Sequence, residues 1–348
     1  MTTETAQSLS RLPRLETKPR FATEGIVAGV DVGGTNQTVA VARLDGEVVA
    51  AHRRRLRKGD TAQDVVANVF EMIDAALADA GSTPQRPGAD KLLRVGVGFG
   101  GPVDPKRGAI LTSHHVPGWD DYPLRDTLER HLNAPAVIDN DANAAALGEA
   151  LFGAGRGHRN ILYVNVGTGI GAGVILQGWV YHGAHGMAGE LGHVTVIPDG
   201  PACGCGKRGC LEAVAAGPSI GRRAREAAQG DPGAAVRLVE LAGGDLQAIA
   251  APQVFQAATS GDSLAARLVE ETAGYLGLAC GNAANLLDPS IIIIGGGISE
   301  TGAPLFTPLR AAVRRHLLPS LPMPEVVPAA LGYDAGVVGA LALALDGL

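Results

Sequence analysis

The order of apolar and polar positions along the chain predicts strands that alternate with helices. The chain opens with a β-meander, in which glycine turns separate three apolar runs: Ile26–Asp31, Thr38–Ala42 and Val48–Ala51. Apolar residues then recur at helical spacing over residues 61–80, behind Asp60 or Thr61 as the N-cap, and this spacing predicts an amphipathic helix. Because strands and helices keep alternating to the C-terminus, the pattern favours an α/β fold.

The opening pattern occurs a second time, over residues 161–182. In both copies a strand is followed by a glycine turn that bears a threonine, and then by a returning strand. The turns contain Gly33, Gly34 and Thr35 in the first copy and Gly167, Thr168 and Gly169 in the second. Each turn offers backbone N–H groups and a hydroxyl, which are the donors that a polyphosphate needs. A single glycine-rich hairpin is often only structural, but the repeat favours two related α/β lobes.

Further apolar runs predict the remaining elements. We expect strands at Leu92–Phe99, Ala136–Ile138, Val180–His182, Ile291–Ile294 and Val326–Ala329, and helices at Pro123–Leu132, Ala144–Phe152, Pro218–Gln229, 234–248, Leu264–Leu287, Pro304–Leu317 and after Asp334 as a cap. The polar segment Asp139–Asn143 stands at a strand-to-helix junction, where ligands of open α/β sheets bind. The glycines at 295–297 indicate either a flat nucleobase pocket or a tight strand–helix crossing.

The repeat divides the chain into two predicted lobes. We expect a small α/β lobe over residues 25–139, completed by a C-terminal helix at 331–348, and a large α/β lobe over residues 140–330. Residues 1–24 have no apolar period and contain Pro13 and Pro19. We therefore expect a flexible tail there, too short for a DNA-binding module.

Three of the four cysteines lie within eight residues of one another, among several glycines. Cys203, Cys205 and Cys210, with His193 ten residues upstream, offer the four ligands of a closed structural zinc site. A disulfide would leave an odd thiol, and Cys203 and Cys205 are too close for relaxed disulfide geometry, so a redox loop is the weaker alternative. Three buried thiols that act as small core residues are the other alternative. The glycine-rich setting favours zinc.

Composition and charge narrow the classes of function. Of 348 residues, 46% are hydrophobic and 18% charged, as in an ordinary globular protein of about two domains. A net charge of −6 favours neither nucleic acid nor an anionic membrane as a partner, and the basic run at 53–58 is interpreted as a solvated strand end. No apolar stretch reaches about 18 residues, and the N-terminus lacks the apolar core of a secretory signal. With three thiols on a metal, we expect a cytoplasmic protein.

Four motifs give the chain a resemblance to a known family. They are Asp31-x-Gly-Gly-Thr, Asn140-Asp141-x-Asn143-Ala-Ala, Gly189-Glu190-x-Gly192-His193 and Cys203-x-Cys205-Gly-x-x-Gly-Cys210-x-Glu212. In this order they resemble the ROK family of sugar kinases and repressors over residues 25–345. The resemblance implies a two-lobed, actin-like or hexokinase-type ATPase fold. The repressors of this family carry an N-terminal DNA-binding module. The tail of this chain cannot hold one, so the chain resembles the kinases of the family.

By this resemblance the protein transfers the γ-phosphate of ATP to a hexose hydroxyl. Asp141 is then the general base that takes the proton from the attacking hydroxyl, although a carboxylate at this position could instead cap the following helix. Asp31 is expected to orient Mg²⁺ through water. The resemblance places the phosphates on Gly33, Gly34, Thr35, Gly167, Thr168 and Gly169, and the adenosine on Gly296 and Gly297.

The resemblance also implies a sugar site. Its residues in this chain are Gly101, Asn140, Asp141, Glu190, His193 and Glu212. Ionised carboxylates suit a ring of donor hydroxyls, and surface acids without a ligand are the alternative interpretation of Glu190 and Glu212. His115, preceded by His114, stands where family members often have asparagine, and it is a further candidate for sugar contact. By holding His193 between Glu190 and Glu212, zinc is expected to order this site.

Glucose, phosphorylated at its 6-hydroxyl, is the acceptor that we expect first. A kinase for N-acetylmannosamine, N-acetylglucosamine or fructose is the alternative within the same chemistry, and polyphosphate is the alternative donor. A non-catalytic, sugar-sensing regulator is the alternative outside enzymes, against which Asp31 and Asp141 argue. The resemblance suggests a homo-dimer or a homo-tetramer.

Overall fold

The computed structural model describes residues 25–44, 46–82, 91–113 and 116–346, and the chain forms two compact units. The first unit is built from the chain up to Gly157, from Gly173–Ala188 and from the segment that begins at Tyr333. The second unit is built from His158–Ala172 and Gly189–Gly332. The predicted tail at 1–24 and the candidate sugar residue His115, with His114, lie outside the described residues.

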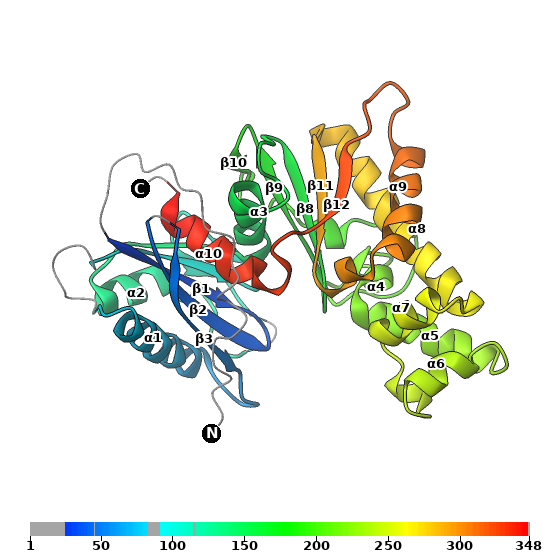
Figure 1. Cartoon of the computed structure of the whole chain (residues 1–348), viewed down its shortest axis with the longest axis horizontal. Helices are drawn as coiled ribbons and strands as arrows, with labels where there is room; N and C mark the ends of the chain where they lie inside the picture. Colours follow the sequence, from blue (N-terminus) through cyan, green and yellow to red (C-terminus); the bar gives the residue numbers. More distant parts are fainter. Residues whose placement is uncertain (1–24, 45, 83–90, 114–115, 347–348) are drawn as a thin grey trace. The chain divides into compact units, whose positions relative to one another are not determined.

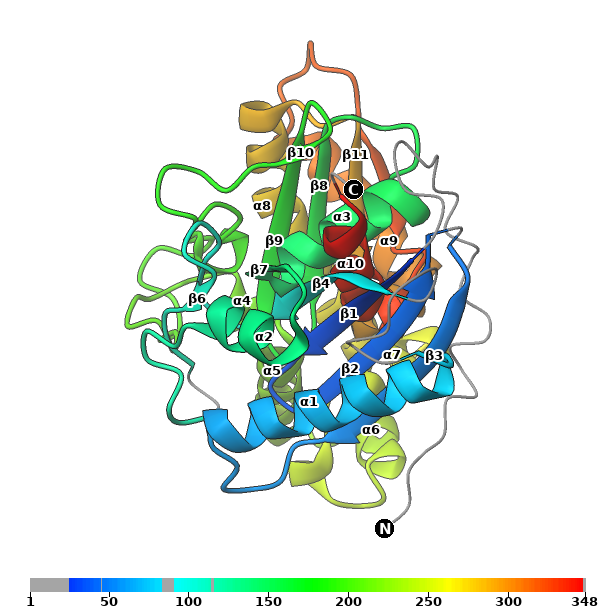
Figure 2. The same cartoon turned by 90° about the vertical axis from the view of Figure 1, so that its left-hand side faces the viewer.

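A five-stranded sheet forms the centre of the first unit. Its strands are β1 (Ile26–Val32), β2 (Asn36–Arg43), β3 (Val48–Arg55), β4 (Leu92–Phe99) and β7 (Ala136–Asn140), in the order β3-β2-β1-β4-β7. The helices are α1 (Ala62–Asp79), α2 (Leu124–Leu132), α3 (Asp141–Phe152) and α10 (Ala335–Leu345), and a small hairpin pairs β5 (Val103–Asp104) with β6 (Ala109–Ile110). β1 runs antiparallel to β2 and parallel to β4. Helices α1 and α2 lie on one side of the sheet and α10 on the other (Figures 1 and 2).

Alternation along β1 explains these two layers. Residues such as Val30 join a buried apolar cluster with the inner faces of α1 and α2. The intervening residues face α10, where side chains are small. A Cβ on Gly29 would lie 2.7 Å from the backbone nitrogen of Leu341, and one on Gly96 would lie 2.0 Å from the carbonyl oxygen of Ala340. Both glycines are therefore needed for α10 to approach the sheet so closely.

The second five-stranded sheet has the order β10-β9-β8-β11-β12. Its strands are β8 (Ile161–Val166), β9 (Ile170–Leu176), β10 (Trp179–Val180), β11 (Ile291–Gly295) and β12 (Glu325–Pro328). The helices are α4 (Glu212–Ala215), α5 (Gly217–Gly230), α6 (Val236–Leu241), α7 (Ala251–Thr259), α8 (Ser263–Leu287) and α9 (Ala303–His316), with single 3-10 turns at η2 (Leu191–His193), η3 (Leu246–Ala248), η4 (Gly297–Thr301) and η5 (Gly332–Asp334). β11 is buried throughout and runs parallel to both β8 and β12. Even α8, 25 residues long, is not apolar enough to cross a membrane, and neither is any other helix in the described part of the chain.

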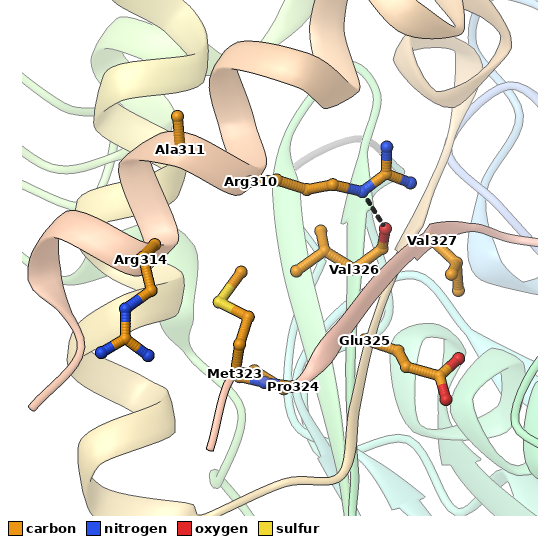
Figure 3. A pocket seen from close by; sticks show the side chains of 8 residues that line it. All are labelled: Arg310, Ala311, Arg314, Met323, Pro324, Glu325, Val326 and Val327. Atoms are coloured by element: carbon orange, nitrogen blue, oxygen red, sulfur yellow. Dashed lines mark hydrogen bonds between the residues drawn. The ribbon is translucent and has the colours of Figure 1, made fainter. Parts of the chain in front are cut away.

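A side-chain hydrogen bond connects helix α9 to the edge strand β12. Arg310 donates a hydrogen bond from Nε to the carbonyl oxygen of Val326 at 2.9 Å (Figure 3). A cavity of about 520 Å³ lies beside this bond, lined by Arg310, Ala311, Arg314, Met323, Pro324, Glu325, Val326 and Val327. It contains none of the residues that the sequence motifs single out.

Two differences from the predicted elements have local causes. The predicted helix at 234–248 is interrupted after Leu241, because Gly243 and Gly244 have φ angles of 72° and 88°, which end a helix. Helix α7 has no counterpart among the predicted elements. Its sequence, APQVFQAAT, contains few large apolar residues and therefore gives only a weak helical period.

The caps of three helices refine the predicted starts. Thr61, not Asp60, caps α1 and exchanges hydrogen bonds with Asp64 in a capping box. α3 begins at Asp141 rather than at Ala144. Asp334 occupies the N-cap position of α10, but its side chain makes no capping bond and lies 3.4 Å from the guanidinium of Arg53 instead.

The predicted lobes at 25–139 and 140–330 do not coincide with the two units. Residues 140–157 and 173–188 belong to the first unit. The physical reason is that α3 packs against α10. A Cβ on Gly339 of α10 would lie 2.3 Å from the carbonyl group of Ala144 in α3, so the two helices touch through their backbones.

Candidate active site

Asp31 and Asp141 lie at the carboxyl ends of strands in the first unit. Asp31 is near the end of β1, and Asp141 follows β7 as the first residue of α3. β4 lies between these strands, with Gly98 next to its last residue and Gly100 just after it. A Cβ on Gly98 would lie 3.6 Å from Cα of Asp141, and one on Gly100 would lie 3.4 Å from its Oδ2. A Cβ on Gly98 would also lie 3.2 Å from Cβ of Ala144, which is tighter than ordinary contact, so Gly98 lets α3 lie close to the end of β4, whereas a Cβ on Gly100 would make only ordinary contact.

The carboxylate of Asp31 is desolvated, and no hydrogen bond from the described residues compensates for the lost water. This desolvation, followed by the charge of Asp141, raises the pKa of Asp31 to about 7, and the charge of Arg53 opposes the shift. Sheet register places Arg53 opposite Thr38, and Thr38 opposite Asp31, so the three side chains share one face. Within the described residues no donor bonds to the Asp31 carboxylate. A hydrated divalent cation would supply the compensation that the protein itself does not.

Asn140 uses both ends of its side-chain amide. Its Oδ1 accepts a hydrogen bond from the backbone nitrogen of Ala142 at 2.9 Å and caps α3, while its Nδ2 donates to the carbonyl oxygen of Gly101 at 3.1 Å. Asn140 therefore occupies the N-cap position of α3. Oδ1 of Asp141 also accepts from the backbone nitrogen of Ala142, at 2.8 Å, so Asp141 shares this capping bond and the capping alternative for its carboxylate stays open. Asn140 and Gly101, both predicted for the sugar site, are thus brought together.

Asp139 and His182, to which the motifs assign no role, meet directly beside these residues. His182 Nε2 lies 2.6 Å from Asp139 Oδ2. The two residues are 43 positions apart, and His182 follows a short strand with no motif of its own. Neither local spacing nor periodicity therefore signals the contact.

The two predicted phosphate turns use their first glycine to close the hairpin. Gly33 donates from its backbone nitrogen to the carbonyl oxygen of Asn36 at 3.0 Å, and Gly167 donates to that of Gly169 at 2.9 Å. These two N–H groups are therefore occupied. The N–H groups of the following residues make no hydrogen bond within the described residues: Gly34, Thr35, Thr168 and Gly169. They are the donors left for an anion.

Packing explains the glycine at 296. Gly296 has a φ of 79°, and a Cβ there would lie 2.2 Å from the carbonyl oxygen of Val166 in β8. The tight crossing that was the alternative to a nucleobase pocket is therefore present. No atom of the described residues lies within 4 Å of the position that a Cβ on Gly297 would take, and the adenosine role of both glycines stays a prediction.

The predicted metal ligands of the second unit gather in one place. One ligand atom from each of His193, Cys203, Cys205 and Cys210 lies within 4.8 Å of the others. The sulfurs of Cys205 and Cys210 are 3.7 Å apart, and Nδ1 of His193 is 3.7 Å from the sulfur of Cys203. Zinc–sulfur bonds of about 2.3 Å in a tetrahedron give ligand separations of about 3.7 Å. The donor set and its spacing therefore fit zinc.

Two glutamates flank this cluster. Glu212 opens α4, and its Oε2 accepts a hydrogen bond from the backbone nitrogen of Ile170 at 2.9 Å, while its Oε1 lies 3.9 Å from the sulfur of Cys203. Glu190 is exposed, with Oε2 3.9 Å from Nε2 of His193. Because Nδ1 of His193 faces the thiols, Nε2 is the nitrogen left for a ligand on the Glu190 side.

The comparisons with known proteins agree on one family. The profile of the ROK family matches residues 27–347. The glucokinase of Halalkalibacterium halodurans is 39% identical over 313 residues, which are 89% of this chain and 92% of that protein. The glucokinase of Thermotoga maritima is 38% identical over 316 residues, 90% and 96% of the two chains. The crystal structure of a ROK family glucokinase from Streptomyces griseus, in complex with glucose and AMPPNP, has a TM-score of 0.79 at 35% identity and covers 93% of this chain and 100% of its own.

The family and the fold class predicted from the motifs are thereby confirmed. A match across nearly the whole chain, with relatives well above 30% identity, leaves no part of the fold to a different family. The chain belongs to the ROK family.

Proposed function

We propose that this protein is an ATP-dependent sugar kinase that converts glucose to glucose 6-phosphate. Similarity to proteins named glucokinases over about nine-tenths of the chain carries the proposal. The Streptomyces griseus neighbour holds glucose and the ATP analogue AMPPNP, which supports this acceptor and this donor.

In the proposed reaction Asp141 acts as the general base. The 6-hydroxyl oxygen of the sugar attacks the γ-phosphorus of ATP, its proton passes to the Asp141 carboxylate, and the bond to the bridging oxygen breaks to release ADP. Asn140 occupies the N-cap position, and the Asp141 carboxylate uses Oδ1 to accept from the backbone nitrogen of Ala142, which leaves Oδ2 as the oxygen proposed to take the proton. The N-terminus of α3, with its positive end of the helix dipole, favours the ionised carboxylate that a base requires.

The donor phosphates are proposed to lie on the free N–H groups of the two turns. These belong to Gly34 and Thr35 in the first turn and to Thr168 and Gly169 in the second. Asp31, which no donor of the described residues satisfies, would hold Mg²⁺ through its water shell. When bound, Mg²⁺ neutralises charge on the β- and γ-phosphates.

For the sugar we propose Asn140, Glu190, His193 and Glu212 as the polar contacts, with Gly101 beside Asn140. His115 remains a proposal for the same site. His193, Cys203, Cys205 and Cys210 would hold a structural zinc ion, whose four protein ligands leave no position for water activation. Its proposed effect is to fix the loop between His193 and Glu212.

Thiolate ligands require a reducing compartment, so we place the reaction in the cytoplasm. A homo-dimer or homo-tetramer stays a proposal for light scattering to test.

A coupled assay of ADP release tests the function. Glucose, N-acetylmannosamine, N-acetylglucosamine and fructose are compared with ATP as the donor, and we expect the highest kcat/KM with glucose. Replacing Asp141 with asparagine should lower kcat about 100- to 10,000-fold, since general-base assistance has this size. No turnover on any sugar would exclude the kinase, and a preference for another sugar would reassign the acceptor. A normal kcat in Asp141→Asn would exclude Asp141 as the base.

A further inference from the structure

The carboxylate of Asp139 is one of the few charged groups buried in the described part of the chain, with a relative exposure of 3%. It accepts three hydrogen bonds. Oδ1 accepts from the backbone nitrogen of Asn140 at 2.7 Å and from Nδ2 of Asn143 at 2.9 Å, and Oδ2 lies 2.6 Å from Nε2 of His182. A buried carboxylate with this many donors fixes the groups that donate to it, because the loss of any donor would leave part of the buried charge without a hydrogen bond.

Two of the three donors belong to the junction that carries the proposed base. Asn140 and Asn143 flank Asp141, one residue before it and two residues after it. Asn143 is buried, and its Oδ1 has no hydrogen-bond partner within the described residues, so its amide is held at one end by Asp139 alone. Asp139 therefore fixes the first turn of α3 from both sides of Asp141.

The third donor comes from a different part of the first unit. His182 follows β10, and its carbonyl oxygen accepts a hydrogen bond from the backbone nitrogen of Ala188 at 3.1 Å. The hydrogen bond to Asp139 raises the pKa of His182, against the opposing effects of burial and of Lys106. Whether charged or neutral, His182 can donate from Nε2, so it compensates the buried Asp139 carboxylate across the neutral range.

We propose that Asp139 and His182 form a positioning pair that holds Asn140 and Asp141 in the geometry needed for phosphoryl transfer. The inference rests on the proposed kinase function, and it assigns these two residues a role that touches neither sugar nor nucleotide. His182 keeps the Asp139 carboxylate turned toward the start of α3, and that carboxylate holds the backbone of Asn140. Small displacements of reacting groups lower rates steeply, so the effect is expected in catalysis before it is expected in folding.

Two substitutions of His182 separate the positioning role from simple packing. Glutamine places its Nε2 near the position of the histidine Nε2, so His182→Gln keeps a donor within reach of Asp139. Asparagine is shorter and places its amide near the histidine Nδ1. His182→Asn therefore removes the hydrogen bond to Asp139 while it keeps a polar side chain at this position. A matched control is His52→Asn, because His52 of β3 makes the same kind of contact with Asp79 of α1, with Nε2 and Oδ2 3.0 Å apart.

The enzyme assay is run on the full chain with saturating ATP and varied glucose. We expect His182→Asn to lower kcat/KM about 10- to 100-fold through kcat as well as KM, the size of effect produced by a displacement near 1 Å. His182→Gln should stay within about threefold of the wild type, and His52→Asn should be indistinguishable from it. Equal kcat values for His182→Asn and the wild type would overturn the proposal, and so would an equal loss in the Asn and Gln variants.

A second measurement does not depend on turnover. Hydrogen exchange of the Asn140 amide reports the bond from its backbone nitrogen to Asp139 directly. We expect exchange at this amide to accelerate at least about tenfold in His182→Asn but not in His52→Asn. If the wild type phosphorylates no sugar, the proposed function fails while this exchange result still stands. If exchange at Asn140 is the same in all variants, the positioning pair is refuted even when glucose is phosphorylated.

Discussion

A single added methyl group tests whether Glu212 is held for sugar binding. Gly169 ends the second glycine turn, and a Cβ there would lie 2.7 Å from Oε2 of Glu212. The same oxygen accepts the hydrogen bond from the backbone nitrogen of Ile170 at 2.9 Å. The φ angle of Gly169 lies outside the left-handed region, so Gly169→Ala adds no backbone strain. Its effect therefore comes from the contact with Glu212.

The size of the effect follows from these distances. The favourable separation of non-bonded heavy atoms is about 3.5 Å, so the Glu212 carboxylate must move away by about 0.8 Å. That retreat breaks or weakens a charge-assisted hydrogen bond, which contributes about 1.5–3 kcal/mol to stability. If Glu212 contacts the sugar, a displacement near 1 Å lowers kcat/KM for glucose by up to about 100-fold.

Gly167→Ala in the same turn is the matched control, because no atom in the described part of the chain lies within 4 Å of its Cβ position. It reports what a methyl group does to the turn and to ATP binding without the contact to Glu212. Glucose affinity is measured by isothermal titration calorimetry and stability by thermal unfolding. We expect Gly169→Ala to bind glucose more weakly and to unfold at a lower temperature than Gly167→Ala. Equal glucose affinity and equal melting temperature in the two variants would refute the reasoning.

Three further predictions address zinc, pH and helix stability. Cys205→Ala should lose zinc by elemental analysis and weaken sugar binding together; a zinc-free variant with an unchanged KM for glucose would separate the two. The pKa of His182 is raised above 6.5 by Asp139, so the extra stability from its charge is complete below that pH and is lost as the pH rises through the raised pKa. The difference in melting temperature between the wild type and His182→Gln should therefore shrink from about pH 6 to about pH 9, and a constant difference would contradict it. Gly274→Ala fills open space within α8 and should stabilise the protein by about 0.5–1 kcal/mol, which a lower melting temperature would disprove.

Local sequence signals were sufficient to predict those parts of the site whose residues lie close together in the sequence. An apolar strand that runs into Asn140 and Asp141 marks a strand-to-helix junction, because both the burial and the polar cap are encoded within a few residues. The three clustered cysteines imply a shared ligand for the same reason. In these places one segment of chain determines its own geometry.

Contacts between distant segments could not be predicted in this way. Asp139 and His182 meet through the packing of the first unit, and nothing around His182 differs from an ordinary residue after a short strand. The division into units depends on the close approach of Gly339 to Ala144. Small residues give no apolar period, so pattern analysis places the boundary at a strand end instead.

Helix α10, which packs on β1 and β4 through Gly29 and Gly96, also has a consequence for biosynthesis. The first unit begins with β1 and is closed by α10, which is the latest helix among the described residues. During translation the face of β1 and β4 stays uncovered until the segment after Tyr333 has left the ribosome, and by then the second unit has emerged. The second unit can therefore fold before the first is complete, and the nascent first unit depends on α10 to cover this face of its sheet.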